Sequence, residues 1–193
     1  IVPPTAGRVL LDGVDTAAPP LTRMRRGMAM VSQDPTLFEG TVRENMDMLG
    51  NYPDSDIWHA LHRAHAHGIV MQRLGGLDGQ ITSSGDQLSV GEKQLLCIAR
   101  AFLCKAQVVV FDEASSSVDA NIGYLIHQSI SKGPSDEDHH PTLLIIAHRL
   151  SSVDACDLIM VLDLGQVKEC GSPGELLRKP DSIFARMMAH NAL

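Results

Sequence analysis

The sequence has no long apolar run, few cysteines and a deficit of basic residues. Its longest uninterrupted apolar runs have five residues, as in Leu143–Ala147. A membrane-spanning helix needs about 20, so no segment of this chain is expected to cross a bilayer. The cysteines form no CxxC pair and are too few for a disulfide framework. Reduced, cytosolic thiols are expected at Cys97, Cys104, Cys156 and Cys170.

The charge balance argues against nucleic acid as the main partner. The chain carries 16 Lys and Arg against 23 Asp and Glu, a net charge of −7, whereas binding to a phosphate backbone needs clustered Lys and Arg. The single basic patch at Arg23, Arg25 and Arg26 does not supply such a surface. A hydrophobic fraction of 44% and a charged fraction of 20% over 193 residues indicate one folded globular domain.

Short apolar runs alternate with helical patterns along the chain. Five runs are too short for helices and predict strands at Arg8–Leu11, Gly27–Ser32, Val108–Phe111, Thr142–Ala147 and Leu158–Leu162. Because the runs are continuous, most of these strands are expected to be buried on both faces. Apolar residues recur at helical spacing in Ile57–Ala64, Leu95–Leu103 and Ile122–Ile130. Strands that alternate with helices indicate an α/β fold with a largely parallel sheet.

Two stretches interrupt this alternation. Thr41–Asp86 contains no predicted strand and indicates a helical subdomain, about residues 41–104, inserted into the sheet domain. Residues 131–140 are polar and contain Gly and Pro, which predicts a surface loop.

The segment Val108–Glu113 (VVVFDE) ends an apolar strand in two adjacent acids. Open α/β folds place their sites at the carboxyl edge of the sheet. There, Asp112 can hold a hydrated Mg²⁺ and Glu113 can orient a water for attack on a phosphoryl group. The alternative is a solvated turn in which Ser115–Ser117 cap the next helix. From this segment alone, both interpretations stay open.

A second segment, Leu88–Glu92 (LSVGE), opens the longest amphipathic helix. Ser89 and Glu92 have the spacing of a capping box. The same geometry suits an anion site, in which the Ser89 hydroxyl, the Gly91 backbone N–H and the positive end of the helix face a phosphate. Taken alone, the segment favours the capping box.

Single polar residues follow two other predicted strands. Gln33 comes after Gly27–Ser32, and His148 comes after Thr142–Ala147. A lone histidine that leaves an apolar strand is more often structural than catalytic, and Gln33 has an equally ordinary explanation as a polar residue at a strand end.

Four histidines lie in the segment Trp58–His67 (WHALHRAHAH). His59 and His62 share the polar face of a predicted helix, which raises a two-point metal site as one interpretation. No cysteine or carboxylate pair nearby completes such a site. Solvated helix histidines are the commoner explanation.

The order of these segments changes their weight. From about Gly7 to Met188 the chain resembles an ATP-binding cassette (ABC) ATPase. VSQDPTLFEGTVREN is similar to the Q-loop region, and LSVGEKQLLCIARAFL to the family signature and its helix. VVVFDEASSSVD is similar to the Walker B strand and D-loop, and AHRL to the switch-histidine segment. The resemblance implies a P-loop NTPase-like sheet core with an inserted helical subdomain.

The resemblance also implies roles at the chain's own nucleotide site. Asp112 would hold Mg²⁺, and Glu113 would be the general base that polarises the attacking water. His148 would contact the γ-phosphate and help to position that water. Gln33 would sense Mg²⁺ and nucleotide and would link the site to a membrane domain.

A second set of contacts follows from the way this family sandwiches two ATP molecules between two head-to-tail domains. Ser89 and Gly91, with Glu92 beside them, would contact ATP bound by the partner domain. Asp119 would lie in the D-loop across the dimer interface.

Finer detail is similar to the second nucleotide-binding domain of C-subfamily (multidrug-resistance-associated type) exporters. LFEGTVREN, DSDIWHAL and SVGEKQLLCIARA carry this likeness. Val90 stands where the signature usually has Gly, and Glu92 where Gln is usual, which adds a negative charge near a phosphate. In that subfamily this signature serves the degenerate ATP site. The intact Glu113 implies that the site built on this domain's own carboxylates hydrolyses ATP.

The sequence contains no GxxxxGK[ST] loop and no Gly-Lys dipeptide. In the family, this phosphate-binding loop lies upstream of the strand that Arg8–Leu11 resembles, and the helix after the loop covers the sheet. The chain begins Ile-Val-Pro-Pro and is expected to be a piece of a longer protein, with the N-terminal part of the domain truncated. By itself it is expected to expose apolar surface, and neither to bind ATP tightly nor to hydrolyse it.

The expected function is that of the ATP-hydrolysing motor domain of an ABC exporter, with ATP and Mg²⁺ as ligands. The expected partners are a second nucleotide-binding domain and transmembrane domains of the same polypeptide, at the cytoplasmic face of a membrane. One alternative is a truncated, non-hydrolytic domain that binds and regulates a partner cassette. The presence of Glu113 and His148 disfavours this alternative. Another alternative is a soluble ABC ATPase of translation or DNA repair. The negative net charge and the exporter-like segment LFEGTVREN disfavour it.

Overall fold

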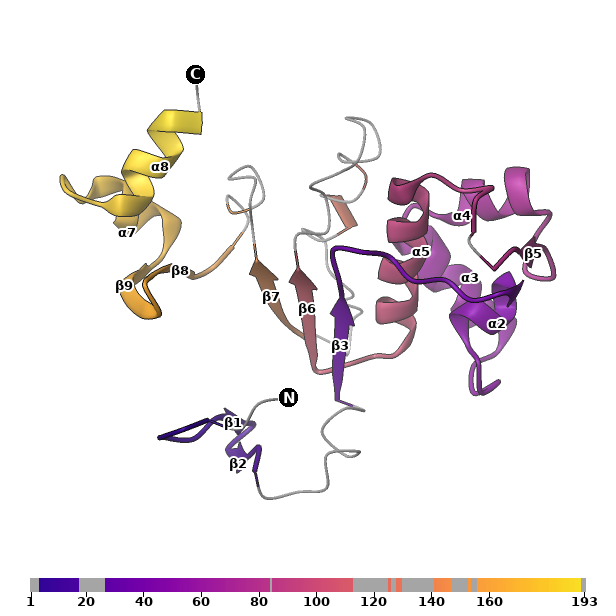
Figure 1. Ribbon diagram of the computed structural model, residues 1–193, viewed down its shortest axis with the longest axis horizontal. Helices are drawn as coiled ribbons and strands as arrows, with labels where there is room; N and C mark the ends of the chain where they lie inside the picture. The colour runs from indigo at the N-terminus through magenta and orange to yellow at the C-terminus, as the bar shows by residue number, and fades with distance from the viewer. Residues whose placement is uncertain are drawn as a thin grey trace.

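The structure is a computed structural model that describes residues 4–17, 27–83, 85–112, 125, 128–129, 141–146, 153 and 156–191. Figure 1 shows a parallel sheet in the middle, a group of helices beside one edge of it, and a C-terminal hairpin with two helices beyond the other edge. The predicted surface loop 131–140 lies outside the described residues. So does the predicted helix at 122–130, apart from residues 125, 128 and 129.

A parallel sheet of three strands stands at the centre of the fold. In spatial order, its strands are β3 (Met28–Val31), β6 (Val108–Asp112) and β7 (Thr142–Ile146). Val31 pairs with Phe111, and Asp112 pairs with Ile146. Because the strands are parallel, their carboxyl ends lie at one edge of the sheet. The predicted α/β fold with a parallel sheet is confirmed in these three strands.

Within the described part of the chain, helices cover this sheet on one face only. Helix α5 (Val90–Leu103) shares a core with Val109 and Phe111, which are fully buried. On the opposite face, Met30 is 64% exposed and Leu144 is 51% exposed. The expectation of burial on both faces is therefore wrong for β3 and β7, whereas central β6 is buried or half-buried throughout. A continuous apolar run does not reveal how many faces a helix covers.

Residues 40–103 form a helical unit beside β3. Its elements are β4 (Gly40–Thr41), α2 (Val42–Met46), α3 (Asp54–Arg63), α4 (His67–Ile69), the π-helix η1 (Val70–Leu74), β5 (Gln80–Ile81) and α5. Strand β4 pairs antiparallel with β5, so the stretch predicted to lack strands carries this short pair. Capping boxes at Thr41 and Ser89 fix the first residues of α2 and α5. The subdomain boundary at about 41–104 stays a prediction.

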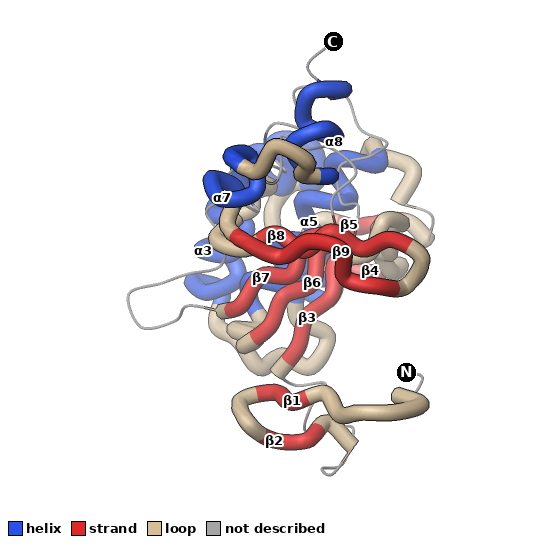
Figure 2. Tube along the Cα trace, turned by 90° about the vertical axis from the view of Figure 1, so that its left-hand side faces the viewer, coloured by secondary structure: helices blue, strands red, loops and turns tan. Residues whose placement is uncertain are grey.

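Two predicted strands belong to antiparallel hairpins instead of the parallel sheet. The first hairpin pairs β1 (Leu10–Leu11) with β2 (Val14–Asp15), and the second pairs β8 (Ile159–Asp163) with β9 (Gln166–Gly171). Their turns, Asp12-Gly13 and Leu164-Gly165, have positive φ at both residues, as tight two-residue turns require. Figure 2 shows the β1–β2 hairpin below the three strands of the sheet.

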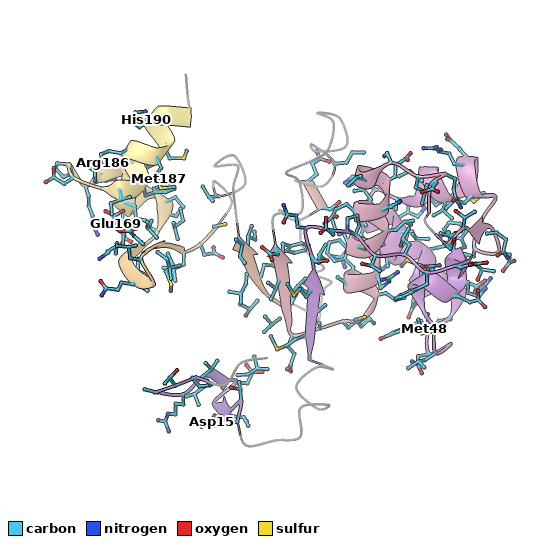
Figure 3. All side chains as sticks on the ribbon, viewed as in Figure 1. Asp15, Met48, Glu169, Arg186, Met187 and His190 are labelled. Carbon is cyan, nitrogen blue, oxygen red and sulfur yellow. The ribbon has the colours of Figure 1, made fainter. Side chains whose placement is uncertain are left out.

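The C-terminal elements form a hydrophobic cluster of their own. Helices α7 (Pro173–Arg178) and α8 (Ile183–Asn191) share a core with β8 through Ile159, Leu176 and Phe184. Glu169 of β9 lies below the start of α8 (Figure 3) and anchors that helix through hydrogen bonds. Among the described residues, no helix is both long and apolar enough to cross a membrane.

Candidate functional site

The carboxyl edge of the sheet brings two predicted site residues to neighbouring strands. Asp112 is the last residue of β6 and is half-buried, and Gln33 lies two residues beyond the end of β3 and is exposed. Val31, the last residue of β3, pairs with Phe111, the residue before Asp112, so the two strands end at about the same level of the sheet. This is the edge at which open α/β sheets bind ligands.

Three predicted site residues, Glu113, Asp119 and His148, lie outside the described residues. In sequence, Glu113 directly follows Asp112 at the end of β6, and His148 comes two residues after the last residue of β7. Their roles stay predictions.

The donors at this edge suit Mg²⁺. The carboxylate of Asp112 and the amide oxygen of Gln33 are hard oxygen donors, which Mg²⁺ prefers. In nucleotide sites, Mg²⁺ is held by one or two such protein groups together with phosphate oxygens and water. The half-buried Asp112 keeps access to solvent, so the residues present fit this kind of site.

Ser89, the predicted signature serine, is the N-cap of α5. Its backbone N–H donates to Glu92 Oε2 at 2.7 Å, and the Glu92 backbone N–H donates to Ser89 Oγ at 3.3 Å. The capping box favoured by the sequence is therefore confirmed. Gly91 is buried in the same turn. A helix N-terminus carries a partial positive charge and N–H groups without helical acceptors, so this turn also has the properties of an anion site.

Glu92 is an ion-paired residue and not an isolated negative charge. It is 8% exposed, and its Oε1 pairs with Nη1 of Arg73 at the end of η1. Burial by itself raises the pKa of the Glu92 carboxyl. Hydrogen bonds from the Ser89 backbone and the Arg73 guanidinium outweigh burial, so this pKa lies below its ordinary value. The negative charge that the sequence placed here is present, but it is compensated.

Sequence reasoning missed Arg73. Nineteen residues separate it from Glu92, and no helical or strand spacing joins the two. Its Nη2 donates to the backbone carbonyl of Gln87 at 2.6 Å, so Arg73 also holds the segment that leads into Ser89. Arg73 lines an open groove together with Thr82 and other polar residues of the β5–α5 connection.

The loop that follows β3 is tied to α5 by three side chains. Gln94 Nε2 donates to the backbone carbonyl of Ser32 at 3.0 Å. Arg100 Nη1 and Cys97 Sγ donate to the backbone carbonyl of Thr36 at 3.2 and 3.7 Å. Positions 94, 97 and 100 are three residues apart and lie on one side of the helix. The predicted Q-loop region therefore packs directly on the predicted signature helix.

Asn45 of α2 forms hydrogen bonds with Phe38, near the C-terminal end of this loop. Its side chain accepts from the Phe38 N–H and donates to the Phe38 carbonyl, both at 2.8 Å. Arg100 Nε donates to the Asn45 carbonyl at 2.8 Å, and the Arg100 guanidinium lies over the Phe38 ring. Sequence reasoning missed Asn45 and Arg100. It also missed Gln94, whose only signal was a glutamine beside the apolar stripe of α5.

The histidines of α3 are engaged differently from the pair that the sequence raised as a metal site. His62 stacks on His67 with 3.8 Å between ring centroids. His59 is exposed and lines a shallow pocket beside Asp56 and Arg63. In the described part of the chain, no group of three or more His, Cys, Asp or Glu side chains is placed to hold a metal ion. These contacts favour the interpretation as ordinary helix histidines.

Comparison with known proteins places these features in a family. Residues 1–116 match the family model described as "ABC transporter". The chain is 41% identical over 188 residues to "ATP-binding cassette sub-family C member 10" of Mus musculus, covering 97% of this chain and 12% of that protein. It is 41% identical over 184 residues to "ATP-binding cassette sub-family C member 2" of Homo sapiens, covering 95% of this chain and 12% of that protein.

A third relative and a solved structure extend the likeness. "ABC transporter C family member 8" of Dictyostelium discoideum is 44% identical over 184 residues, which is 95% of this chain and 11% of that protein. The fold is similar to a bacterial Atm1-family ABC exporter with ATP bound, with a TM-score of 0.85 and 33% identity. That match covers 98% of this chain and 32% of the exporter chain, so it extends over the sheet, the helical unit and the C-terminal elements.

Proposed function

Because the chain belongs to the ABC transporter family, we propose that it is the ATP-binding and ATP-hydrolysing motor domain of a C-subfamily exporter. One observation supports the proposal most: at the carboxyl edge of the parallel sheet, Asp112 ends β6 and Gln33 follows the adjacent strand β3. The loop of Gln33 is joined to α5, which starts at Ser89. The C-subfamily relatives and the exporter fold support the exporter class.

At the chain's own nucleotide site, Asp112 and Gln33 would hold Mg²⁺ together with the phosphates of ATP. When bound there, Mg²⁺ would supply positive charge that offsets the charge of the phosphates. Glu113 accepts the proton of the attacking water as general base, and His148 contacts the γ-phosphate and orients that water. The placement of Asp112 and Gln33 at one sheet edge supports this assignment.

In the proposed transporter, a second nucleotide-binding domain packs head-to-tail against this one. Ser89 and Gly91 at the start of α5 contact the γ-phosphate of ATP held by that partner, with Glu92 beside them. Asp119 lies at the interface. ATP binding closes the two domains, and hydrolysis reopens them.

In this proposal, ATP hydrolysis by the domain drives movement of transmembrane domains of the same polypeptide. The chain would then work at the cytoplasmic face of a membrane. The curated relatives are much longer proteins, of which this chain spans 11 to 12%. The loop of Gln33 is fixed to both α2 and α5. It therefore supplies a direct route from the nucleotide edge of the sheet to the helical unit.

The proposed magnesium ligand gives a direct test of the hydrolytic function. In the transporter polypeptide, Asp112→Asn removes a charge but keeps the side-chain size, and the Mg²⁺ concentration for half-maximal ATP hydrolysis should rise at least tenfold. Asp163→Asn is a matched control, because Asp163 is an exposed aspartate at the end of β8. An unchanged Mg²⁺ requirement in Asp112→Asn would contradict the proposed site.

A non-hydrolytic partner-binding domain is a second candidate, and the exposed Ser89 at the start of α5 is the residue that it would use. Such a chain would offer only the start of α5 to ATP bound by another cassette. The two candidates separate when the purified 193-residue chain is mixed with the ATP-loaded partner domain. The second candidate would be favoured if the chain associates with the partner domain only when ATP is bound, and if the full polypeptide that contains this chain has no phosphate-binding loop and adds no ATP hydrolysis.

A further inference from the structure

Glu92 occupies the third position of α5, and both of its carboxylate oxygens are engaged. Oε2 accepts the backbone N–H of Ser89 at 2.7 Å, and Oε1 pairs with Nη1 of Arg73. Glu92 is 8% exposed, so little solvent screens its charge from the turn in which it lies. The Arg73 guanidinium is a cation paired directly with this carboxylate.

Arg73 reaches the same turn in a second way. Its Nη2 donates to the backbone carbonyl of Gln87 at 2.6 Å, two residues before Ser89. The planar guanidinium thus bridges a side chain inside the turn and a carbonyl at its entrance. This two-point geometry suits an arginine and is not reproduced by the single ammonium group of a lysine.

A carboxylate at this place has opposite effects on the helix and on a ligand. It stabilises the first turn, because negative charge is favourable near the positive end of a helix. It disfavours an anion at the same end, because two negative charges a short distance apart repel each other. Compensation by Arg73 removes the second effect and leaves the capping box intact.

We propose that Arg73 is a positioning residue for the nucleotide phosphate: by pairing with Glu92 and holding the Gln87 carbonyl, it keeps the Ser89–Gly91 turn able to receive the γ-phosphate of ATP. This inference rests on the proposed function. It explains how a signature with Glu92 in place of glutamine retains a usable anion site. The pair compensates the added charge instead of removing it.

The test uses a charge-rescue series in the full transporter polypeptide. Arg73→Met leaves the Glu92 charge uncompensated and should raise the KM for ATP about tenfold, with a smaller change in kcat, because closure around ATP becomes harder at the turn of Ser89. Arg73→Met combined with Glu92→Gln removes the charge as well and should return KM to within about threefold of the unsubstituted protein. Glu92→Gln alone is the reference for the double variant, and in that background Arg73→Met should change KM by less than about threefold.

Arg43→Met is the matched control, since Arg43 also forms ion pairs, but with Asp54 and Asp78, which lie outside α5 and outside the turn of Ser89. Thermal unfolding of every variant separates a folding defect from a binding defect. If Arg73→Met is too unstable to assay, Arg73→Lys takes its place, with an intermediate KM expected because the charge remains without the two-point geometry.

Two results would overturn the inference, and a third would overturn the proposed function on which it rests. An unchanged KM in Arg73→Met would show that the pair has no influence on ATP. A double variant as impaired as Arg73→Met would show that Arg73 acts only on the fold. If the unsubstituted transporter does not hydrolyse ATP, the proposed function itself fails, which is a different outcome from normal hydrolysis with no effect of Arg73.

Discussion

The side-chain amide of Gln94 donates a hydrogen bond of 3.0 Å to the backbone carbonyl of Ser32 and joins α5 to the residue before Gln33. Gln94 is 1% exposed, so the donor of this part-buried bond is shielded from water. Ser32 follows the last residue of β3, and Ser89 is the N-cap of α5. One hydrogen bond therefore connects the two segments that the proposed function assigns to the two nucleotide sites.

Removal of this bond should loosen both segments. We expect Gln94→Leu, which keeps roughly the same volume, to lower the free energy of unfolding by about 1 kcal/mol, because one buried hydrogen bond is lost. In the transporter it should also raise the Mg²⁺ requirement of hydrolysis, because the loop of Gln33 is less well held. Denaturant unfolding and a Mg²⁺ titration measure the two effects.

Gln72→Leu is the control, because Gln72 is an exposed glutamine of η1 and its substitution should stay within about 0.5 kcal/mol. If Gln94→Leu behaves like Gln72→Leu in both measurements, the proposed link between α5 and the Gln33 loop has no energetic weight.

The open face of the sheet should govern the solubility of the 193-residue chain. Met30 of β3 and Leu144 of β7 lie on the two strands that flank β6, and they are 64% and 51% exposed. Exposed apolar patches promote association. Met30→Thr with Leu144→Thr keeps β-forming residues while removing apolar area. The double variant should bind less of a hydrophobic dye and stay monomeric at higher concentration in light scattering.

Leu164→Asn is the comparison for that experiment, since Leu164 is also strongly exposed but lies in the turn of the second hairpin, where its positive φ suits asparagine. Equal improvement from Leu164→Asn would show that general hydrophobicity, and not the open sheet face, controls association.

Acid should weaken the attachment of α8. The backbone N–H groups of Phe184 and Ile183 donate to Glu169 at 3.0 and 2.8 Å, and they hold the pKa of its carboxyl below the ordinary value of 4.5. A carboxyl with a lower pKa in the folded state contributes stability that is present above its unfolded pKa and lost as pH falls through the folded value.

Glu169→Gln should therefore lower the unfolding midpoint at pH 7, and the difference from the unsubstituted chain should shrink as pH falls below about 4.5. Urea unfolding between pH 3 and pH 7 measures both effects, with Glu39→Gln at an exposed position as the control. A difference that does not change with pH would show that the charge of Glu169 does not anchor α8.

The 193-residue chain by itself should bind ATP only weakly. It contains no GxxxxGK[ST] loop, whose backbone N–H groups and lysine cradle the phosphates in P-loop proteins. Isothermal titration calorimetry of the purified chain should show no binding in the micromolar range and no hydrolysis. Micromolar affinity would mean that described residues such as Asp112 and Gln33 suffice to hold the nucleotide.

Local sequence signals predicted the parts of the fold that local chemistry determines. The run Val108–Phe111 was assigned to a strand that became β6, and the spacing of Ser89 and Glu92 predicted the capping box at the start of α5. The parallel sheet followed from the alternation of strands and helices. In each case the determining contacts lie within a few residues of the chain.

The remaining features depend on contacts between distant residues. The pairing of Arg73 with Glu92 crosses 19 residues, and that of Gln94 with Ser32 crosses 62, so no periodicity reveals either. The burial prediction failed at β7 because Thr142–Ile146 is largely apolar on both sides, while the described elements cover only one side. The first hairpin carried a usable signal in Asp12-Gly13, a dipeptide typical of two-residue turns.

The most direct test of the account concerns Glu113, the proposed general base. Glu113→Gln in the transporter polypeptide keeps the size of the side chain but removes its ability to accept a proton. Single-turnover hydrolysis of bound ATP should fall at least a hundredfold, with ATP affinity changed less than threefold. Hydrolysis at the unsubstituted rate in Glu113→Gln would contradict the central claim that this domain's own carboxylates drive ATP hydrolysis.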